Sequence, residues 1–421
     1  MRFSRPLLDA CAAALSEVLR FARPADAVLS HFFREHANLG RRDRALIAET
    51  VYAVVRRLRL LSRLSGSDSP RQLALAAWVA LLGANLREVS AFSARAEEEQ
   101  LARIKADAHL PQSFEVECDL PDWLIERLRR RFDDGALLAL ARGMQRGAPL
   151  DLRVNLARTS RAEVISALAA DGIGAQATPY SPAGVRVAGN PAINAHSLFR
   201  AGLVEVQDEG SQILCCLVAP RRGEMVVDFC AGAGGKTLAL GMLMRSIGRL
   251  YAFDVSAKRL AQLKPRLARS GLSNVHPQRI ENERDPRLAR LAGKIDRVLV
   301  DAPCTGLGTL RRNPDLKWRR SAADLEELRA KQAAILGAAA RLVKPGGRLV
   351  YATCSLLDEE NRAVVDAFRA AHSEFTLKPA CQVLAQERIP LEMGEVLELW
   401  PHRHATDGFF AVVLERSAGG A

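Results

Sequence analysis

The sequence predicts an α/β protein whose main domain is built on a mostly parallel sheet, preceded by an all-helical domain and a small α/β module. Residues 202–416 alternate short β-branched runs with helical stretches, as parallel sheets do. Residues 6–110 carry apolar side chains at three-to-four spacing with few strand patterns, which predicts helices. We therefore expect domains at 1–118, 119–200 and 201–421.

The first domain is divided by turn-forming sequences into a small helical bundle. The breaks fall at Arg23-Pro24, at Asn38-Leu-Gly40 and at Ser65-Gly-Ser-Asp-Ser-Pro70. Its helices are rich in arginine, which fits either contact with RNA or a solvated helix face.

The second domain mixes strand and helix patterns within a short stretch. Leu150–Asn155 and Val185–Val187 read as strands, and Ser160-Arg-Ala-Glu163 has the form of a capping box that opens a helix.

The third domain carries the alternation that predicts the parallel sheet. Helical stretches such as Ala257–Arg269 and Ala323–Leu342 supply the crossovers. Lys344-Pro-Gly-Gly347 is expected to stop a helix before the last parallel strand. The expected strands are Met225–Cys230, Leu250–Asp254, Asn274–Ile280, Ile295–Asp301, Gly347–Cys354 and Gly408–Glu415.

Charge favours a polyanionic partner. The net charge is +12 and the sequence pI is about 9.7. Lysine and arginine that neutralise phosphates release condensed counterions, so such a surface suits nucleic acid, although an arginine-rich composition also promotes solubility.

Cysteine usage indicates a reducing compartment. None of the eight cysteines forms a Cys-x-x-Cys pair, which argues against a zinc site or a disulfide framework. His402 and His404 lack a third ligand, so we expect no metal. The N-terminus lacks the apolar core of a secretory signal, and Leu73–Leu86 is too short to span a bilayer. We expect a cytoplasmic protein with no membrane partner, acting as a monomer.

A glycine-rich turn follows the first strand of the third domain. In Asp228-Phe-Cys-Ala-Gly-Ala-Gly-Gly-Lys-Thr237 the glycines let backbone approach a ligand closely. The glycine spacing does not match the dinucleotide-binding fingerprint. It does not match the phosphate-loop motif either, because that motif requires glycine at the position of Cys230. A nucleoside-type ligand remains compatible with the turn. Asp254 ends the next strand, where it can accept from ribose hydroxyls or cap the helix near Ser256.

Two cysteines stand where predicted strands end. Cys304 lies in Asp301-Ala-Pro-Cys304, and Cys354 lies in Tyr351-Ala-Thr-Cys354. Because reactive groups collect beyond the carboxyl ends of parallel strands, both thiols can face one bound cofactor. A buried inert thiol is the commoner fate of a free cysteine and is expected for Cys215, Cys216 and Cys230.

These stretches resemble the Sun/Fmu type of RNA cytosine-C5 methyltransferase, which uses S-adenosylmethionine. The resemblance covers nearly the whole chain and is most specific at Asp228–Thr237, Asp301–Trp318, Tyr351–Asn361 and Thr406–Phe410. The helical part, around Leu39–Tyr52, is similar to that of the bacterial enzymes for small-subunit (16S) ribosomal RNA, which resembles the antitermination factor NusB. The resemblance implies a Rossmann-like class I methyltransferase domain, preceded by a NusB-like domain and a small α/β RNA-binding module.

The resemblance also assigns roles to residues. Cys354 is implied to be the nucleophile, and Cys304 is implied to release the product. Two departures from the family pattern occur. Ala233 stands where proline is frequent. After the third strand the family's aspartate near the adenine is missing, so either Glu281 or Asn282 replaces it or that contact is lost. The implied cofactor-binding residues are Cys230, Ala231, Gly232, Ala233, Gly234, Gly235, Lys236, Asp254, Glu281 and Asp301.

Cytosine chemistry independently requires such a nucleophile. Carbon 5 is unreactive until a thiolate adds at carbon 6, and a base must later remove the proton at carbon 5. A free thiol has a pKa near ~8.5, so Cys354 needs a positive field, to which Lys236 can contribute. Asp301 can hydrogen-bond the ring's amine or N3, or simply cap a turn.

A basic run with an aromatic residue follows Cys304. Arg311, Arg312, Lys317 and Trp318 suit phosphate contact and base stacking, or else form a solvated loop. If the chain methylates RNA, we expect the target base to be flipped out of its stack and into the active site.

Other functions stay open at this point. Cys304 can be the nucleophile instead, as in DNA enzymes. The chain can also be a non-catalytic RNA-binding assembly factor on a methyltransferase fold, or, more remotely, a nucleotide-hydrolysing enzyme.

Overall fold

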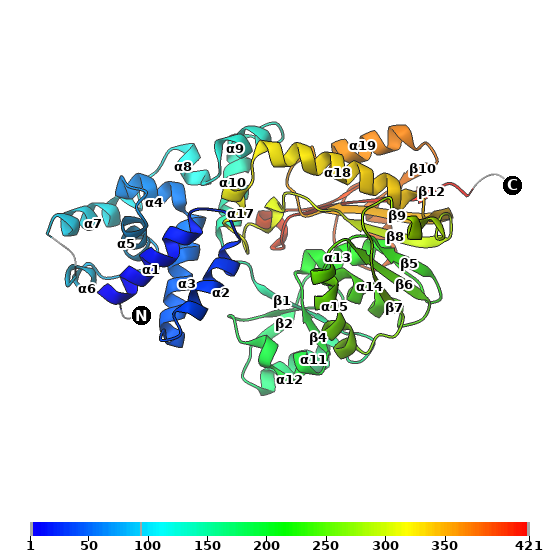
Figure 1. Ribbon diagram of the computed structural model, residues 1–421, viewed down its shortest axis with the longest axis horizontal. Coiled ribbons are helices and arrows are strands. Elements are labelled where there is room, and N and C mark those ends of the chain that lie inside the picture. Colours follow the sequence, from blue (N-terminus) through cyan, green and yellow to red (C-terminus); the bar gives the residue numbers. More distant parts are fainter. Residues whose placement is uncertain (1–2, 93–94, 419–421) are drawn as a thin grey trace. The chain divides into compact units, whose positions relative to one another are not determined.

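A computed structural model describes residues 3–92 and 95–418, and the chain divides into two units (Figure 1). Unit 1 holds the chain up to Gly147 together with Thr309–Ala322, and unit 2 holds Ala148–Gly308 and the chain from Ala323 onward. The chain therefore leaves unit 2 shortly after Cys304 and returns to it at Ala323. The fourteen residues between, Thr309–Ala322, belong to unit 1.

Unit 1 is helical, as its sequence pattern predicts, and its helices begin and end at the expected turn sequences. Ser69 caps one helix by accepting from the Gln72 N–H, and Gly66 ends the preceding one in the left-handed conformation (φ +64°). The helices are α1 (Arg5–Val18), α2 (Ala25–Glu35), α3 (Arg41–Arg56), α4 (Leu58–Ser65), α5 (Pro70–Ala80), α6 (Leu86–Ser90), α7 (Arg95–Asp107), α8 (Phe114–Cys118), α9 (Asp122–Leu128), α10 (Asp134–Gln145) and α17 (Leu316–Arg319).

Helix α5 forms the centre of unit 1 because it is apolar on nearly all sides. Every residue from Leu73 to Val79 is buried, and the Trp78 Nε1–H donates to Thr50 Oγ1 at 2.8 Å. The two helices α9 and α10 also cluster with unit 1, whereas the sequence pattern placed the end of the helical domain at residue 118.

Unit 2 begins with a four-stranded antiparallel sheet in the order β2-β3-β1-β4. The expected capping box opens its helix, with Ser160 Oγ accepting from the Glu163 N–H. Its elements are β1 (Leu150–Val154), α11 (Arg161–Ala170), β2 (Ala175–Ala177), β3 (Gly184–Val187), η1 (Ile193–Ala195), α12 (Ser197–Arg200) and β4 (Val204–Val206).

The second sheet of unit 2 has the order β10-β12-β9-β8-β5-β6-β7, with β11 paired to β12. Strands β5 to β9 run parallel, and β12 is antiparallel to β9. All six expected strands are present. The strands are β5 (Met225–Asp228), β6 (Arg249–Asp254), β7 (Val275–Arg279), β8 (Ile295–Asp301), β9 (Val343–Thr353), β10 (Phe375–Lys378), β11 (Leu397–Leu399) and β12 (Phe409–Arg416).

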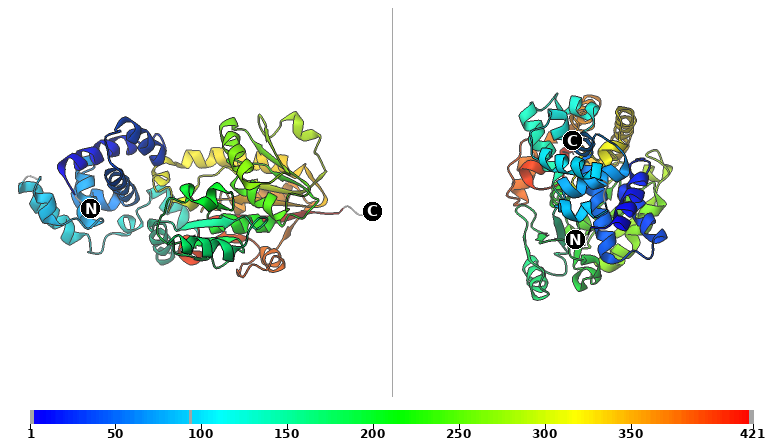
Figure 2. Two further views of the ribbon diagram at one scale, coloured as in Figure 1. Left: turned by 90° about the horizontal axis from the view of Figure 1, so that it is seen from below. Right: turned by 90° about the vertical axis from the view of Figure 1, so that its left-hand side faces the viewer.

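Helices cover both faces of this sheet, as Figure 1 and the further views in Figure 2 show. In Figure 1, α18 and α19 lie on one face, and α13, α14 and α15 lie on the other. The helices are α13 (Glu209–Val218), α14 (Gly235–Leu243), α15 (Ala257–Ser270), α16 (Pro286–Ala289), α18 (Ala322–Ala340), α19 (Arg362–Ala371), α20 (Ala380–Gln386) and α21 (Pro401–His404), with the short η2 at Leu307–Thr309.

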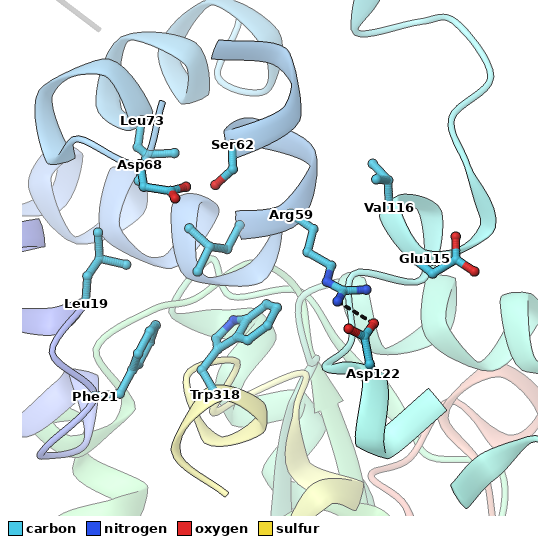
Figure 3. Close-up of a pocket in the computed structure, with 11 residues that line it drawn as sticks. Leu19, Phe21, Arg59, Ser62, Asp68, Leu73, Glu115, Val116, Asp122 and Trp318 are labelled. Carbon is cyan, nitrogen blue, oxygen red and sulfur yellow. Dashed lines mark hydrogen bonds and ion pairs between the residues drawn. The ribbon is translucent and has the colours of Figure 1, made fainter. Parts of the chain in front are cut away.

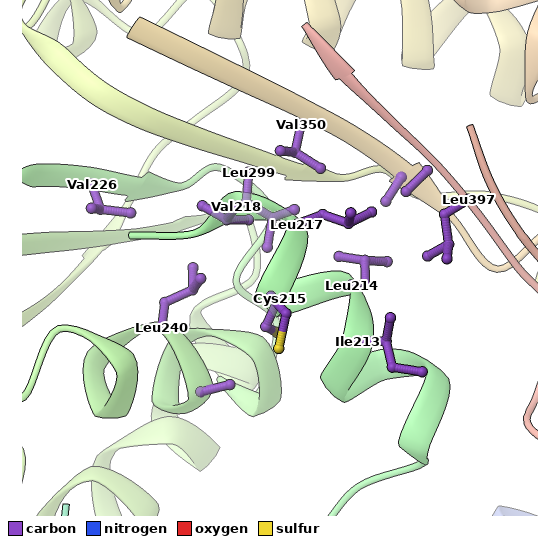
Figure 4. Close-up of a cluster of buried hydrophobic side chains, with 14 of the residues drawn as sticks. Ile213, Leu214, Cys215, Leu217, Val218, Val226, Leu240, Leu299, Val350 and Leu397 are labelled. Atoms are coloured by element: carbon purple, nitrogen blue, oxygen red, sulfur yellow. The ribbon is translucent and has the colours of Figure 1, made fainter. Parts of the chain in front are cut away.

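One core cluster fixes α13 against the sheet (Figure 4). Leu214 and Leu217 of α13 are fully buried, together with Val226, Leu299 and Val350 from three adjacent strands. Burial of such side chains is the main favourable term in folding, so the strand ends that carry the site rest on a closely packed base.

The segment Lys344-Pro-Gly-Gly347 is not a helix stop, which corrects the sequence-based expectation. It lies inside β9, where the pairing with β8 shifts from Ile295–Val343 to Arg297–Arg348. The extra residues form an irregular bulge, and Gly346 adopts φ +74° there.

None of the helices within residues 3–92 and 95–418 is both long and apolar enough to cross a membrane.

Candidate active site

The carboxyl ends of four parallel strands meet at one edge of the large sheet. Asp228, Asp254 and Asp301 end β5, β6 and β8, and Thr353 ends β9 beside them. The strand order reverses at β5, which pairs with β6 on one side and β8 on the other. Ligands of open α/β sheets bind in the crevice at such a reversal.

The glycine-rich turn after β5 adopts a conformation that needs glycine. Gly232 and Gly234 have φ of +56° and +85°, and a Cβ on Gly234 would stand 2.1 Å from Leu263 Cδ1. The Gly232 N–H donates to Asp254 Oδ2 at 2.8 Å, and the Ser256 N–H donates to Asp254 Oδ1 at 2.7 Å. Asp254 therefore braces the turn and caps the next loop, and each oxygen keeps a further lone pair for a ligand.

Two arginines that the sequence analysis missed hold this turn from outside. Arg153 Nη1 donates to the Gly235 carbonyl at 2.6 Å, and Arg266 Nη1 donates to the Ala233 carbonyl at 2.6 Å. Arg266 is also paired with Glu205 of β4 at 3.0 Å. Burial lowers the pKa of Arg153 to about 10. The alternating pattern of Leu150–Val154 placed Arg153 on a strand, but nothing in it indicated a contact 82 residues further along the chain.

Lys236 and Asp301 form an ion pair within the site. Lys236 Nζ donates to Asp301 Oδ2 at 2.6 Å, and it lies 5.6 Å from the centre of the Phe409 ring. Burial alone would lower the pKa of Lys236, but the Asp301 carboxylate outweighs it and raises the pKa. The lysine charge is thus largely matched by Asp301, which limits the field it exerts on Cys354.

Asp228 is buried beneath the turn, where Thr237 Oγ1 donates to its Oδ2 at 2.7 Å. It is 1% exposed, and burial raises its pKa from 3.8 to about 7. The folded protein therefore binds a proton that the unfolded chain has already released in this range.

That shift predicts a pH dependence of stability. Because the folded state holds the extra proton, the free energy of unfolding should fall by about 1.4 kcal/mol per unit as pH rises from 5 to 7. In Asp228→Asn this contribution should be absent, so urea unfolding of the variant should show a flatter pH profile. Equal slopes for the two proteins would contradict the assignment.

The two thiols come together at the ends of β8 and β9. Cys304 Sγ and Cys354 Sγ are 3.4 Å apart, and both side chains are partly buried. The hydrogen bond to Cys354 and then burial raise the pKa of Cys304 well above its usual range.

A close backbone approach locks the Cys354 loop. The Gly308 N–H donates to the Cys354 carbonyl at 2.8 Å, and a Cβ on Gly308 would stand 2.2 Å from the Gly408 carbonyl oxygen. Any side chain at position 308 would therefore force this loop and the start of β12 apart.

The other cysteines near the sheet lack such a setting. Burial raises the pKa of Cys215 to about 12, and it also raises the pKa values of Cys216 and Cys230. These thiols are protonated at neutral pH, in line with the inert role expected for them.

The loop after β7 is organised by an acid that the sequence analysis did not select. Asp285 is 5% exposed and accepts from the Glu281 N–H at 2.9 Å, while the Asn282 side chain accepts from the Arg284 N–H. A hydrogen bond from Arg287 lowers the pKa of Asp285. The Glu281 side chain is exposed.

Lys317 is unavailable to RNA, which corrects its place in the expected basic run. It is 3% exposed, and its ammonium donates to the Arg56 carbonyl at 2.9 Å and to the Asp119 carbonyl. Burial lowers its pKa from 10.5 to about 8. Arg311 is also buried, at 5% exposure, whereas Arg312 is partly exposed. Sequence spacing could not show that this segment inserts into unit 1.

Trp318 belongs to the same insertion. Its Nε1–H donates to the Val55 carbonyl at 2.9 Å, and the ring packs against the core of unit 1. Trp318 and Phe21 line a pocket of about 650 Å³. The ion pair between Arg59 and Asp122 also lines this pocket (Figure 3). The indole packs within unit 1 and is partly exposed, and its stacking on an RNA base stays a prediction.

Known proteins share this architecture. The family described as 16S rRNA methyltransferase RsmB/F matches residues 215–415, and the ferredoxin-like domain of RsmF/B-like proteins matches residues 120–194. The probable ribosomal RNA small subunit methyltransferase B of Synechocystis is 35% identical over 306 residues, which cover 72% of this chain and 68% of the relative. The chain belongs to the RsmB/F family.

Other relatives agree with this membership. The probable ribosomal RNA small subunit methyltransferase B of Bacillus subtilis is 32% identical, over 72% of this chain and 67% of that protein. The crystal structure of PH0851 is 28% identical and covers 99% of this chain and 100% of its own, with a TM-score of 0.78. The expected resemblance and the α/β fold, with a helical region, a ferredoxin-like sheet and a methyltransferase sheet, are thereby confirmed.

Membership in the RsmB/F family makes this chain an RNA methyltransferase that uses S-adenosylmethionine as methyl donor. The residues present fit that cofactor, because the turn exposes backbone at two positive-φ glycines and Asp254 ends the neighbouring strand in hydrogen bond to the turn. An acid at this position suits ribose hydroxyls.

Proposed function

We propose that this RsmB/F-family protein methylates carbon 5 of a specific cytosine in 16S ribosomal RNA through a covalent adduct between Cys354 Sγ and cytosine carbon 6. The observation that carries the proposal is the pair of sulfurs 3.4 Å apart at the sheet edge that also holds Asp301 and the glycine-rich turn. The small-subunit methyltransferases among its relatives support ribosomal RNA as the substrate.

S-adenosylmethionine, when bound, supplies a methyl group that its sulfonium makes electrophilic. The turn offers backbone groups for its amino-acid part, and Asp254 is placed to accept from its ribose. The residues proposed to hold it are Cys230, Ala231, Gly232, Ala233, Gly234, Gly235, Lys236, Asp254, Glu281 and Asp301.

Cys354 starts the reaction as a thiolate. Its sulfur adds to carbon 6 of cytosine, and the electron pair of the C5–C6 double bond moves so that carbon 5 becomes nucleophilic. After carbon 5 has gained the methyl group, a base removes the proton from that carbon. The double bond reforms, and the bond from carbon 6 to Cys354 breaks.

Cys304 assists this release. Its raised pKa keeps it protonated, so its S–H can donate to the Cys354 sulfur 3.4 Å away as that sulfur leaves as a thiolate. We assign removal of the proton of carbon 5 to a water molecule that Cys304 positions.

Asp301 contacts the target base. Since Lys236 donates to its Oδ2, Asp301 is an acceptor in this pair, and Oδ1 can accept from the exocyclic amine of cytosine. This favours the amine over N3 among the two contacts expected from sequence, and it selects cytosine, because uracil presents a carbonyl at the same place.

The RNA partner is supported by the net charge of +12. Arg312 remains the proposed phosphate contact of the basic run, with Arg311 and Lys317 committed to unit 1. All eight cysteines are free, which supports a reducing cytoplasmic site of action.

The test is methylation of defined RNA in solution. The purified protein, S-adenosylmethionine and 16S RNA should yield 5-methylcytosine at one position by bisulfite sequencing, and 23S RNA should yield none. A methyl group on another base, or on carbon 5 of uracil, would overturn the proposal.

A further inference from the structure

A buried carboxylate joins the two cysteine loops. Glu360, at the N-terminal side of α19, is 0% exposed, and each of its oxygens accepts two hydrogen bonds. Oε1 accepts from the Thr305 N–H at 2.8 Å and from Gln332 Nε2 at 2.9 Å. Oε2 accepts from Thr305 Oγ1 at 2.5 Å and from Ser355 Oγ.

These donors are the chain neighbours of the reactive thiols. Thr305 follows Cys304 and Ser355 follows Cys354, and their hydroxyl oxygens are 3.2 Å apart. One carboxylate therefore holds the residue after each cysteine, although Cys304 and Cys354 are fifty residues apart in the chain.

The other side of Cys304 is held by the same network. Gln332 of α18 donates through its Nε2 to the Pro303 carbonyl at 3.0 Å as well as to Glu360. Both chain neighbours of Cys304 are therefore linked to the Glu360 carboxylate. Thr305 donates to it directly, and Pro303 is linked to it through Gln332.

Glu360 is itself fixed to the sheet. Its backbone carbonyl accepts from the Tyr351 hydroxyl at 2.7 Å, and its N–H donates to the Leu357 carbonyl at 3.1 Å. The next residue, Asn361, accepts from Thr353 Oγ1 and donates to the Ser355 carbonyl at 3.1 Å. The carboxylate therefore has little freedom to follow a displaced loop.

The hydrogen bonds to Glu360 come from neutral donors, so its burial costs desolvation free energy that an apolar side chain would avoid. Unlike an apolar side chain, a carboxylate can accept four hydrogen bonds at once, and here it accepts them from donors on both cysteine loops and on α18.

We propose that Glu360 is a positioning residue, which clamps the Cys304 and Cys354 loops together and so sets the separation of their sulfurs for product release. The inference rests on the proposed roles of the two thiols. Glu360 acts through Thr305 and Ser355, so its loss should misplace Cys304 and slow the release step. The charge of Glu360 also helps to raise the pKa of Cys304, after the hydrogen bond between Cys304 and Cys354 and after burial.

The test compares Glu360→Ala with Glu360→Gln in the full-length protein, using 16S RNA and S-adenosylmethionine. In Glu360→Ala we expect release to slow by roughly 10²-fold and a protein–RNA adduct to accumulate, because a catalytic group displaced by about 1 Å loses that much. Glu360→Gln keeps the shape, and the two hydroxyls can rotate to accept from its amide, so turnover should stay within a few-fold of the parent. Glu359→Ala, one residue away, is the matched control and should turn over normally.

A coupling measurement separates a clamp from a general loss of stability. In a Cys304→Ala background, release no longer depends on the position of Cys304, so adding Glu360→Ala should slow it by less than about 2-fold. If Glu360→Ala does not fold, the Thr305→Val and Ser355→Ala double variant takes its place, with the same expected adduct.

The outcomes distinguish this inference from the proposed function. If Cys304→Ala traps an adduct but folded Glu360→Ala releases product at the parent rate, the clamp is refuted and the two-thiol mechanism stands. The clamp is also refuted if Glu360→Ala slows release equally with and without Cys304. If Cys304→Ala itself traps nothing, the proposed function fails first.

Discussion

Replacing Cys354 by alanine is expected to abolish methyl transfer, lowering the single-turnover rate by roughly 10⁴-fold or more, as loss of a covalent nucleophile does. Without a thiolate at carbon 6, carbon 5 of cytosine has no means of becoming nucleophilic. Transfer of a labelled methyl group to 16S RNA measures the effect, and no adduct should form.

The matched control for this variant is Cys381→Ala. Cys381 is an exposed free thiol on α20, outside the site, so its removal should leave the rate unchanged. Methyl transfer that persists in Cys354→Ala but is lost in Cys304→Ala would reverse the roles and make Cys304 the nucleophile.

Replacing Cys304 by alanine is expected to trap the enzyme on its RNA. Cys354 can still add to carbon 6 and the methyl group can still be accepted, but the leaving sulfur loses the S–H that stands 3.4 Å away. Release should slow by roughly 10²- to 10⁴-fold, the range for loss of a proton-transfer group.

The trapped species should appear as a denaturant-resistant band that contains both protein and RNA on a gel. Its formation should require S-adenosylmethionine and an intact Cys354, so the double variant that lacks both thiols should give no band. Normal turnover by Cys304→Ala would remove the reason for placing a second thiol in the site.

Strand ends were the part of this site that sequence could predict. Asp254 and Asp301 end expected strands, and parallel strands bring their carboxyl ends to one edge. The strand expected to reach Cys230 ends at Asp228 instead. The same rule predicted that Cys304 and Cys354 can share a cofactor site, and the structure places their sulfurs in contact. Periodicity also located the helical region and the breaks at Pro24, Gly40 and Pro70.

Features that depend on contacts between distant segments could not be predicted. The sequence around Lys317 and Trp318 is typical of an exposed basic loop. In the structure the chain enters unit 1 at Thr309. The Lys317 and Trp318 side chains there donate to backbone carbonyls of α3, and Lys317 also donates to that of Asp119. Lys344–Gly347 has the composition of a helix stop, but pairing with β8 continues around it as a bulge.

Glu360 illustrates the same limit within the site. The motif Asp358-Glu-Glu-Asn361 contains three acids and an amide, and nothing in the sequence distinguishes one acid from the others. Only the fold shows that Glu360 is fully buried. Strands β10 and β11, with four and three residues, are too short for a periodicity signal and exist because β12 offers them a partner.

The most direct test of the central claim is to identify the residue that bonds to the base. RNA that carries 5-fluorocytosine should hold the parent enzyme in the adduct, because carbon 5 then has no proton to lose. Digestion and mass spectrometry of that adduct should place the modified nucleotide on the peptide that contains Cys354, through sulfur at carbon 6. A nucleotide found on Cys304, or no covalent linkage at all, would contradict the account.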